Sequence, residues 1–230
     1  MRVLAGQIQS TRQQVIRIDY EGEPAPGGKF QDELTAAVTT AVADADAVII
    51  SDYNYGIATP EIGAVVRDAT RGGNIPALVD SRFRLSEFPG FTSATPNEDE
   101  VEELLGAKHG DLATLAAAAE ELRRKLGYQA LLVTRGGHGM TMVEANSEPF
   151  HIDAVGSTQP VDVTGAGDTV IATYALGLAA GASFAEAARL ANFAGGIVVM
   201  KRGTATVTSP ELIAAALAKA TDDPSSAIGR

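Results

Sequence analysis

The chain has 230 residues, of which 45% are hydrophobic and 20% charged, a balance typical of a folded protein rather than of a disordered chain. Its formal net charge of −11 argues against general binding to nucleic acid or to anionic membranes, which need basic surfaces. The absence of cysteine excludes a disulfide framework and a thiolate metal site, and it is compatible with the reducing cytoplasm, where we expect the protein to reside. No apolar run is long enough to span a membrane, and the first residues carry no signal pattern.

Strands and helices are expected to alternate along the chain. One or two extended strands are predicted within residues 1–20, before a loop rich in proline and glycine at 21–29. Further strands are predicted at 47–50, 77–80, 93–96, 130–134, 140–143 and 149–152, and helices at 31–44, 59–71, 97–105, 111–126, 169–180, 183–200 and 209–220. This alternation implies an α/β fold with a mostly parallel sheet and helices on both faces. We predict one domain over residues 1–220, with a frayed tail at 221–230.

Short local signals support several of these boundaries. Thr59 precedes a proline and an acid, so we expect it to cap the helix at 59–71. Ser183, with a glutamate three residues later, has the pattern of a capping box. The apolar run at 47–50 is typical of a strand buried on both faces of a parallel sheet. Asp52 follows that strand, at the end where open α/β sheets collect their ligands.

The chemistry of the chain is concentrated in residues 160–169, where a β-branched run leads through a glycine turn into a long apolar helix pattern. Gly165, Ala166 and Gly167 leave backbone N–H groups uncovered at the start of that helix, where the helix dipole also favours an anion. Asp168 places a carboxylate beside this anion site. The pairing makes sense if Asp168 accepts a proton from a nucleophile while the amides hold transferring phosphoryl oxygens.

Plainer interpretations of the same turn stay open on the residues alone. Asp168 can be a first-turn acid that complements the helix dipole, and the glycines can form only a tight strand-to-helix turn. A dinucleotide-binding fingerprint fits loosely, but it belongs to an opening βαβ unit and has no acid inside its loop.

The run Asp-Val-Thr-Gly-Ala-Gly-Asp at 162–168 resembles the second signature of the PfkB, or ribokinase-like, sugar kinases, and the similarity continues through 191–196 and 203–207. The resemblance covers nearly the whole chain. It implies a three-layer αβα ribokinase-like fold and the phosphorylation of a sugar hydroxyl by ATP. It also implies that Asp168 is the catalytic base, that the amides of the glycine turn stabilise the phosphoryl group, and that Mg²⁺ bridges the phosphates.

The resemblance further implies which residues bind the nucleotide. Asn97 and Glu100 match the family's Asn-x-x-Glu motif, in which the glutamate acts indirectly on Mg²⁺; the alternative is a helix cap completed as a capping box. Thr134, Gly136 and Gly139 match a Thr-x-Gly-x-x-Gly loop that helps to hold nucleotide phosphates.

The resemblance makes predictions for two further pairs of residues. Asn192 and Gly195 resemble the helix that flanks the adenine pocket, with close helix packing on small residues as the alternative. Asp162 and Thr164 resemble positions that hold a monovalent cation in some relatives.

Residues 12–19 and 51–53 resemble the branch of the family that phosphorylates D-glycero-D-manno-heptose 7-phosphate at the anomeric hydroxyl, for lipopolysaccharide core precursors. The resemblance predicts that the sugar phosphate is bound by Arg12, Gln13 and Asp52. Tyr55 and Arg82 stand where that branch usually or often has lysine, so another sugar or nucleoside acceptor is kept as an alternative.

The chain begins inside what would be the family's lid, so we expect an N-terminally truncated fold in which residues 1–20 are the remnant of the lid and substrate strands. This keeps a third alternative open, a catalytically inert nucleotide-binding or assembly subunit. A sheet edge left without its neighbouring strands would favour association of copies, so we expect a homo-oligomer, in the simplest case a dimer.

Overall fold

The computed structural model describes residues 2–5, 13–18, 28–72, 74–108, 110–156 and 160–222. At its centre lies a six-stranded sheet whose strands follow chain order: β3 (Val48–Asp52), β4 (Ala77–Ser81), β5 (Ser93–Ala94), β6 (Ala130–Thr134), β7 (Met140–Glu144) and β8 (Phe150–Ile152). The first four strands are parallel, and β7 and β8 extend the sheet with antiparallel pairs. The predicted mostly parallel sheet and its terminal hairpin are confirmed.

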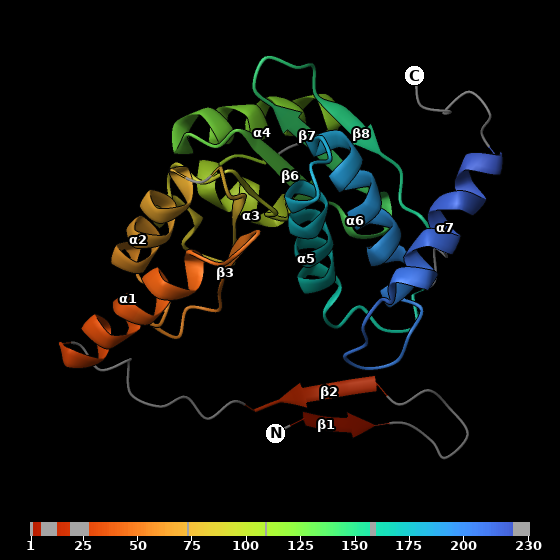
Figure 1. Cartoon of the computed structure of the whole chain (residues 1–230). Helices are drawn as coiled ribbons and strands as arrows, with labels where there is room; N and C mark the ends of the chain where they lie inside the picture. Colours follow the sequence, from red (N-terminus) through yellow and green to blue (C-terminus); the bar gives the residue numbers. More distant parts are fainter. Residues whose placement is uncertain are drawn as a thin grey trace.

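Helices cover both faces of this sheet (Figure 1). One face packs against α2 (Pro60–Arg71), α3 (Glu98–Leu105) and α4 (Leu112–Leu126), and the other against α5 (Ala166–Ala179) and α6 (Phe184–Val198). At the outside, α1 (Lys29–Val42) packs on α2 and α7 (Ser209–Asp222) on α6; short 3₁₀ turns lie at η1 (Leu85–Glu87) and η2 (Gly136–His138). The three-layer αβα architecture predicted from the sequence is therefore confirmed.

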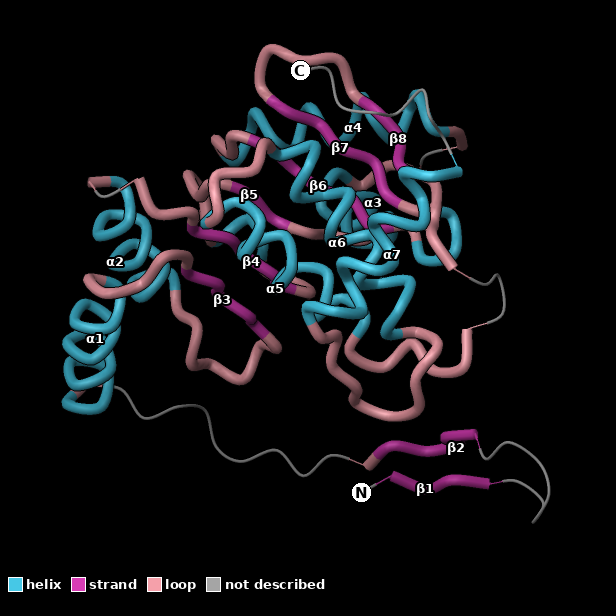
Figure 2. Tube along the Cα trace, turned by 45° about the vertical axis from the view of Figure 1, so that its right-hand side comes forward, coloured by secondary structure: helices cyan, strands magenta, loops and turns pink. Residues whose placement is uncertain are grey.

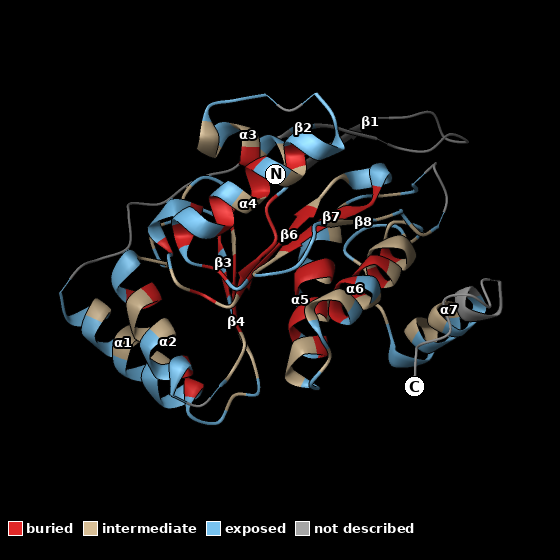
Figure 3. Ribbon diagram, turned by 90° about the horizontal axis from the view of Figure 1, so that it is seen from above, coloured by how far each residue is buried: buried red, intermediate tan, exposed pale blue. Residues whose placement is uncertain are grey.

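The core has two parts because successive side chains of a strand point to opposite faces. In β6, Leu131 and Val133 belong to the cluster under α4, whereas Ala130 and Leu132 belong to the cluster under α5 and α6. Figure 3 shows buried residues along β6 and β7, with α4 on one side and the α5–α6 pair on the other. A central strand buried on both faces explains why this segment reads as an uninterrupted apolar run.

Local signals set the helix starts as expected. The hydroxyl oxygen of Thr59 accepts a hydrogen bond from the backbone N–H of Ile62, and Pro60 follows at the first helical position. Ser183 and Glu186 form the predicted capping box at the start of α6.

Two expectations from the sequence need correction. The helix predicted at 169–180 begins earlier, at Ala166, so that the glycine turn is part of its start. The strand predicted at 47–50 is not buried on both faces, since Ile49 is 37% exposed. The reason is that β3 is the last strand of the sheet: it pairs with β4, and no other strand of the described residues pairs with its second edge.

The strands expected near the start of the chain form a separate two-stranded antiparallel sheet of β1 (Arg2–Ala5) and β2 (Gln13–Arg17), whose register shifts between Val3 and Leu4. Figures 1 and 2 show this pair apart from the main body of helices and sheet. Among the described helices, none combines the length and apolar character needed to cross a membrane.

Candidate active site

The glycine turn forms the start of α5. Gly165 is its N-cap residue, with a φ of 77° that lies in the left-handed region, and no side chain caps the helix. The backbone N–H groups of Gly167 and Asp168 have no acceptor within the described part of the chain, whereas that of Ala166, expected to be uncovered, donates to the carbonyl oxygen of Val163 at 3.2 Å because the chain turns back one residue before the helix. A Cβ atom on Gly167 would meet nothing within 4 Å, so the turn is open on that side. Unpaired donors thus stand at the positive end of the helix dipole, the arrangement that binds phosphate oxygens.

Asp168 lies on this first turn, and its two carboxylate oxygens have different surroundings. Oδ1 accepts a hydrogen bond of 2.8 Å from the hydroxyl of Tyr53, which follows β3. Oδ2 has no donor among the described residues and lies 3.9 Å from the position that a Cβ on Gly165 would take. An oxygen with this environment, beside unpaired amides, can accept a proton from a hydroxyl bound at the turn.

Two more carboxyl groups lie in this region: the charge of Asp168 acts on Asp80, and the charge of Asp80 acts on Glu100. Burial, followed by the negative charge of Asp168, raises the pKa of Asp80 from 3.8 to about 6, against the opposing effect of Arg82. Burial also raises the pKa of Glu100, and the charge of Asp80 adds to the effect, whereas the backbone N–H of Asn97 opposes it. The described residues contain no group of three or more acidic or histidine side chains able to hold a metal. The half-buried carboxyl group of Glu100 nevertheless fits Mg²⁺, which takes oxygen ligands and shares them with substrate phosphates.

The structure brings the two predicted nucleotide motifs together. Asn97 forms a parallel bridge with Thr134, and the backbone N–H of Thr134 donates to the carbonyl oxygen of Pro96 at 2.9 Å. Asn97 and Glu100 also form the capping box of α3, with both bonds at 2.9 Å. The cap accounts for these two residues without a nucleotide, so their action on ATP and Mg²⁺ stays a prediction.

The two glycines predicted to hold phosphates in the turn after β6 have different surroundings. A Cβ on Gly139 would lie 2.0 Å from the carbonyl oxygen of Ile152, so the close approach of β8 requires glycine there. A Cβ on Gly136 would meet nothing within 4 Å, which leaves room for a ligand. The turn is fixed by Arg135, whose side chain forms an ion pair of 2.6 Å with Glu98.

Asn192 and Gly195 lie on α6 and make packing contacts. Asn192 is buried and donates from Nδ2 to the carbonyl oxygen of Asp153 at 2.8 Å. A Cβ on Gly195 would lie 3.1 Å from a methyl group of Val170 on α5. The packing alternative therefore accounts for both residues, and contact with adenine stays a prediction.

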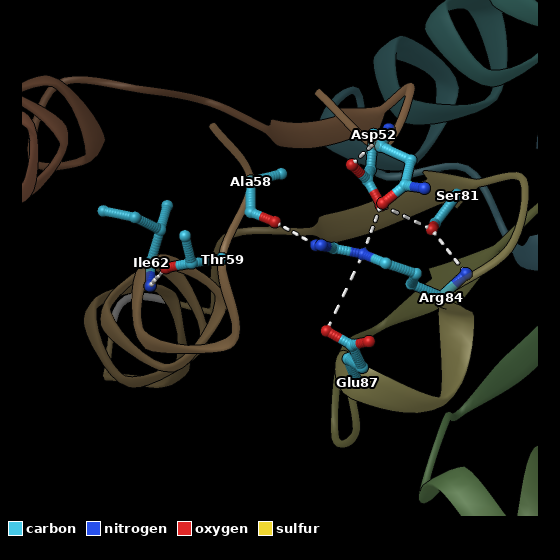
Figure 4. A network of polar contacts seen from close by, with 8 residues as sticks. Asp52, Ala58, Thr59, Ile62, Ser81, Arg84 and Glu87 are labelled. Atoms are coloured by element: carbon cyan, nitrogen blue, oxygen red, sulfur yellow. Dashed lines mark hydrogen bonds and ion pairs between the residues drawn. The ribbon is translucent and has the colours of Figure 1, made fainter. Parts of the chain in front are cut away.

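Asp52, predicted to bind substrate, is buried and already has several donors. Its Oδ2 accepts from the hydroxyl of Ser81 at 2.8 Å and from Nε of Arg84 at 3.2 Å, and its Oδ1 accepts from the backbone N–H of Asn54 at 2.9 Å. Figure 4 shows Asp52, Ser81 and Arg84 converging in this network. Asp52 is thus a structural anchor of the segment that follows β3.

Arg84 extends the same network to the far end of that segment. Its Nη2 donates to the carbonyl oxygen of Ala58, one residue before the cap of α2 (Figure 4). The guanidinium group therefore holds both ends of the loop 52–58, which carries Tyr53 between them.

The remaining predicted residues are less informative. Arg12 lies outside the described residues, and Gln13 begins β2, where its backbone pairs with Ala5. Asp162 accepts hydrogen bonds of 2.9 Å from the backbone N–H groups of Thr164 and Gly203, so it ties the turn before α5 to a second loop. Binding of a monovalent cation by Asp162 and Thr164 stays a prediction.

An apolar groove of about 550 Å³ runs along the edge of β3 that no described strand pairs with. The groove is lined by Leu34 and Val38 of α1, by Ile49 of β3 and by Ile62 of α2. Tyr53, which follows β3, also lines it. Tyr53, Asp80 and Arg84 were not assigned to the site from sequence, although polar residues at the ends of two neighbouring parallel strands are a signal that could have found them.

A family model described as the pfkB family carbohydrate kinase matches residues 23–212. The chain belongs to the pfkB family. The family is described as one of carbohydrate kinases, which are phosphotransferases with an alcohol group as acceptor. Among curated relatives of this pfkB protein, the Bifunctional protein HldE of Trichlorobacter lovleyi is 42% identical over 207 residues, which are 90% of this chain and 42% of that protein. The Bifunctional protein HldE of Caulobacter vibrioides is 44% identical over 205 residues, 88% of this chain and 42% of the relative. The chain thus spans less than half the length of these relatives.

Solved structures of other sugar kinases share the fold. Escherichia coli phosphofructokinase-2 in complex with potassium superposes with a TM-score of 0.74 at 19% identity, over 90% of this chain and 67% of the other. Arabidopsis thaliana ribokinase complexed with ribose and ATP gives a TM-score of 0.69 at 22% identity, over 93% and 68% of the two chains. The ribokinase-like fold predicted for this pfkB protein is therefore confirmed.

Proposed function

We propose that this chain transfers the γ-phosphoryl group of ATP to a sugar or sugar phosphate hydroxyl, with D-glycero-D-manno-heptose 7-phosphate, phosphorylated at the anomeric position, as the substrate. The observation that carries the proposal is the first turn of α5, where the unpaired N–H groups of Gly167 and Asp168 stand beside the Asp168 carboxylate. An anion site with a base beside it suits phosphoryl transfer to a neutral hydroxyl.

In the proposed reaction, Oδ2 of Asp168 accepts the proton of the sugar hydroxyl. The amides of Gly165 and Gly167 border the place where the transferring phosphoryl oxygens develop charge, so they would lower the barrier by electrostatic stabilisation. The N–H of Ala166, the third predicted amide, already donates to the carbonyl oxygen of Val163. Glu100 would act indirectly, through water, on Mg²⁺, which neutralises phosphate charge when bound. Thr134, Gly136 and Gly139 would hold nucleotide phosphates, and Asn192 and Gly195 would border adenine.

The heptose substrate is supported by the relatives named Bifunctional protein HldE at about 40% identity, and it would place the reaction in lipopolysaccharide precursor synthesis in the cytoplasm. Those relatives are more than twice as long as this chain, so their whole activity is not transferred here. Another sugar or nucleoside acceptor is the alternative within the same chemistry, and a panel of acceptors separates the two.

Asp168→Asn tests the reaction. We expect turnover to fall at least about a hundredfold, because general-base catalysis contributes on the order of 10²–10⁴ in rate. ATP binding measured by calorimetry should stay unchanged, since the amides and the fold are retained. Turnover that survives in the variant would show that Asp168 is not the base, and a wild-type chain that phosphorylates no acceptor would contradict the kinase function itself.

A second candidate is a nucleotide-binding assembly subunit without turnover, and we propose in either case that copies of the chain associate as a dimer. The observation that favours association is the free edge of β3 beside an apolar groove, because such edges readily pair with another chain. ATP binding without turnover would favour the assembly role, and a mass of one chain in sedimentation equilibrium would contradict the dimer.

A further inference from the structure

Tyr53 makes the one side-chain hydrogen bond to the proposed base among the described residues. Its hydroxyl lies 2.8 Å from Oδ1 of Asp168, across 115 positions of sequence, so the bond joins the loop after β3 to the first turn of α5. Tyr53 is 54% exposed, and therefore its ring does not serve mainly to fill the core. The contact with Asp168 is the feature of this side chain that needs an explanation.

The segment that carries Tyr53 is rigidly held. The carboxylate of Asp52 accepts the backbone N–H of Asn54 and spans Tyr53 in a short turn, and Asn54 has a φ of 62°. Arg84 fixes the start of the loop through Asp52 and its end through the carbonyl oxygen of Ala58. A tyrosine on such a loop presents its hydroxyl from a defined position.

The direction of the bond follows from the chemistry of the two groups. An ionised carboxylate only accepts hydrogen bonds, so the phenol must donate. The bond to Asp168, followed by partial burial, raises the pKa of Tyr53 above its ordinary value, and the phenol accordingly keeps its proton at neutral pH. Oδ1 is thus occupied while Oδ2 lies toward Gly165.

We propose that Tyr53 is a positioning residue for phosphoryl transfer, which holds Oδ1 of Asp168 so that Oδ2 stays turned toward the glycine turn. The inference rests on the proposed kinase function. In that step the acceptor hydroxyl gives its proton to Oδ2, the hydroxyl oxygen forms a bond to the γ-phosphorus, and the bond from phosphorus to the bridging oxygen breaks. ADP leaves with the electron pair, so atoms and charge balance.

Tyr53→Phe tests this role because it removes only the hydroxyl. Tyr55→Phe is the matched control: Tyr55 lies in the same loop, is 51% exposed and has no hydrogen bond to Asp168. With ATP and heptose 7-phosphate we expect Tyr53→Phe to lower kcat about tenfold at unchanged KM for the sugar, since small misplacements of a catalytic group cost up to about 10²-fold. The control should retain the wild-type kcat.

Two kinetic results would overturn the proposal. Equal kcat in the two variants would make the hydroxyl of Tyr53 dispensable. A higher kcat/KM in Tyr53→Phe would show that the phenol occupies the place of the acceptor hydroxyl and must leave before reaction.

A titration separates failure of this inference from failure of the proposed function. The tyrosinate absorbance of wild type minus that of Tyr53→Phe reports the Tyr53 phenol, and Asp168→Asn should shift this titration to lower pH. An unchanged titration in Asp168→Asn would overturn the contact whether or not the chain is a kinase. If the titration shifts and the wild type phosphorylates no acceptor, the proposed function has failed, and the catalytic role of Tyr53 falls with it.

Discussion

Arg84 forms an ion pair of 3.2 Å with Asp52 in which only 2% of the Asp52 side chain is exposed. A carboxylate removed from water in this way depends on its partners, because an unpaired buried charge is strongly destabilising. The pair also ties the start of η1 to the loop 52–58, so it acts both on stability and on the geometry around Tyr53. Asp52 was predicted to bind substrate, but its carboxylate is buried because it forms this ion pair.

Replacement of Arg84 by leucine should therefore affect stability and activity together. We expect the free energy of unfolding to fall by about 3 kcal/mol, since removal of one partner of a buried pair costs roughly this much. The loop would lose both of its fixed ends, so kcat should also fall. Urea unfolding followed by circular dichroism measures the first effect, and ATP turnover measures the second.

Arg124→Leu is the control for that variant, because Arg124 is 68% exposed and its ion pair with Glu120 spans 3.8 Å at the surface. Exposed pairs contribute about 0–1 kcal/mol. If both variants lost the same stability, the Arg84–Asp52 pair would be of no more consequence than a surface contact.

Two glycines of one turn should respond in opposite ways to alanine. In Gly139→Ala the new Cβ would lie 2.0 Å from a backbone carbonyl oxygen, so the turn or β8 must move, and we expect a loss of about 3 kcal/mol or more in stability. In Gly136→Ala the Cβ meets nothing within 4 Å, and the cost is about 1 kcal/mol for a left-handed alanine. Gly136→Ala should nonetheless weaken ATP binding if this turn holds phosphates.

Thermal unfolding and calorimetric ATP titration of the two proteins check these effects. Unchanged ATP affinity in Gly136→Ala would remove this turn from the nucleotide site. Equal stability of the two variants would contradict the close approach between Gly139 and Ile152.

Features of the fold that depend on neighbouring residues could be predicted from the sequence. The strand at 130–134 and the cap at Thr59 depend on neighbours in the chain, and both are found as predicted. The glycine turn was likewise located, because few sequences leave amides uncovered before an apolar helix. Its adjoining helix starts at Ala166, since glycine and alanine here continue the helix rather than precede it.

Contacts between segments far apart in the chain could not be predicted from the sequence. The bond between Tyr53 and Asp168 depends on how the β3 loop and α5 pack, which no spacing in the sequence encodes. Burial of Ile49 was overestimated because an apolar run looks the same in a central strand and at an edge. The capping box of Asn97 and Glu100 could be predicted only as an alternative, since a cap and a ligand site use the same residue types.

Asp80 should make stability depend on pH. Its pKa is raised from 3.8 to about 6, first by burial and then by the charge of Asp168, with Glu100 and Arg82 as further charged neighbours. Between about pH 4 and pH 6 the folded chain therefore holds a proton that the unfolded chain has released. By linkage, the free energy of unfolding increases as pH falls through this range. Above pH 6, Asp80 is ionised in the folded chain, and its charge destabilises the fold by the full amount.

Asp80→Asn removes that charge, so we expect the variant to be more stable than wild type at pH 7.5 by about 3 kcal/mol, given about 1.4 kcal/mol per pKa unit. The difference should shrink below pH 6 and approach zero near pH 4, where wild-type Asp80 is protonated. Urea unfolding at a series of pH values measures the difference. Asp44→Asn, at an exposed position, should follow the wild type throughout. A stability gain that stayed constant from pH 7.5 to pH 4 would trace the effect to packing of the amide, because only an ionising carboxyl group makes the gain vary with pH.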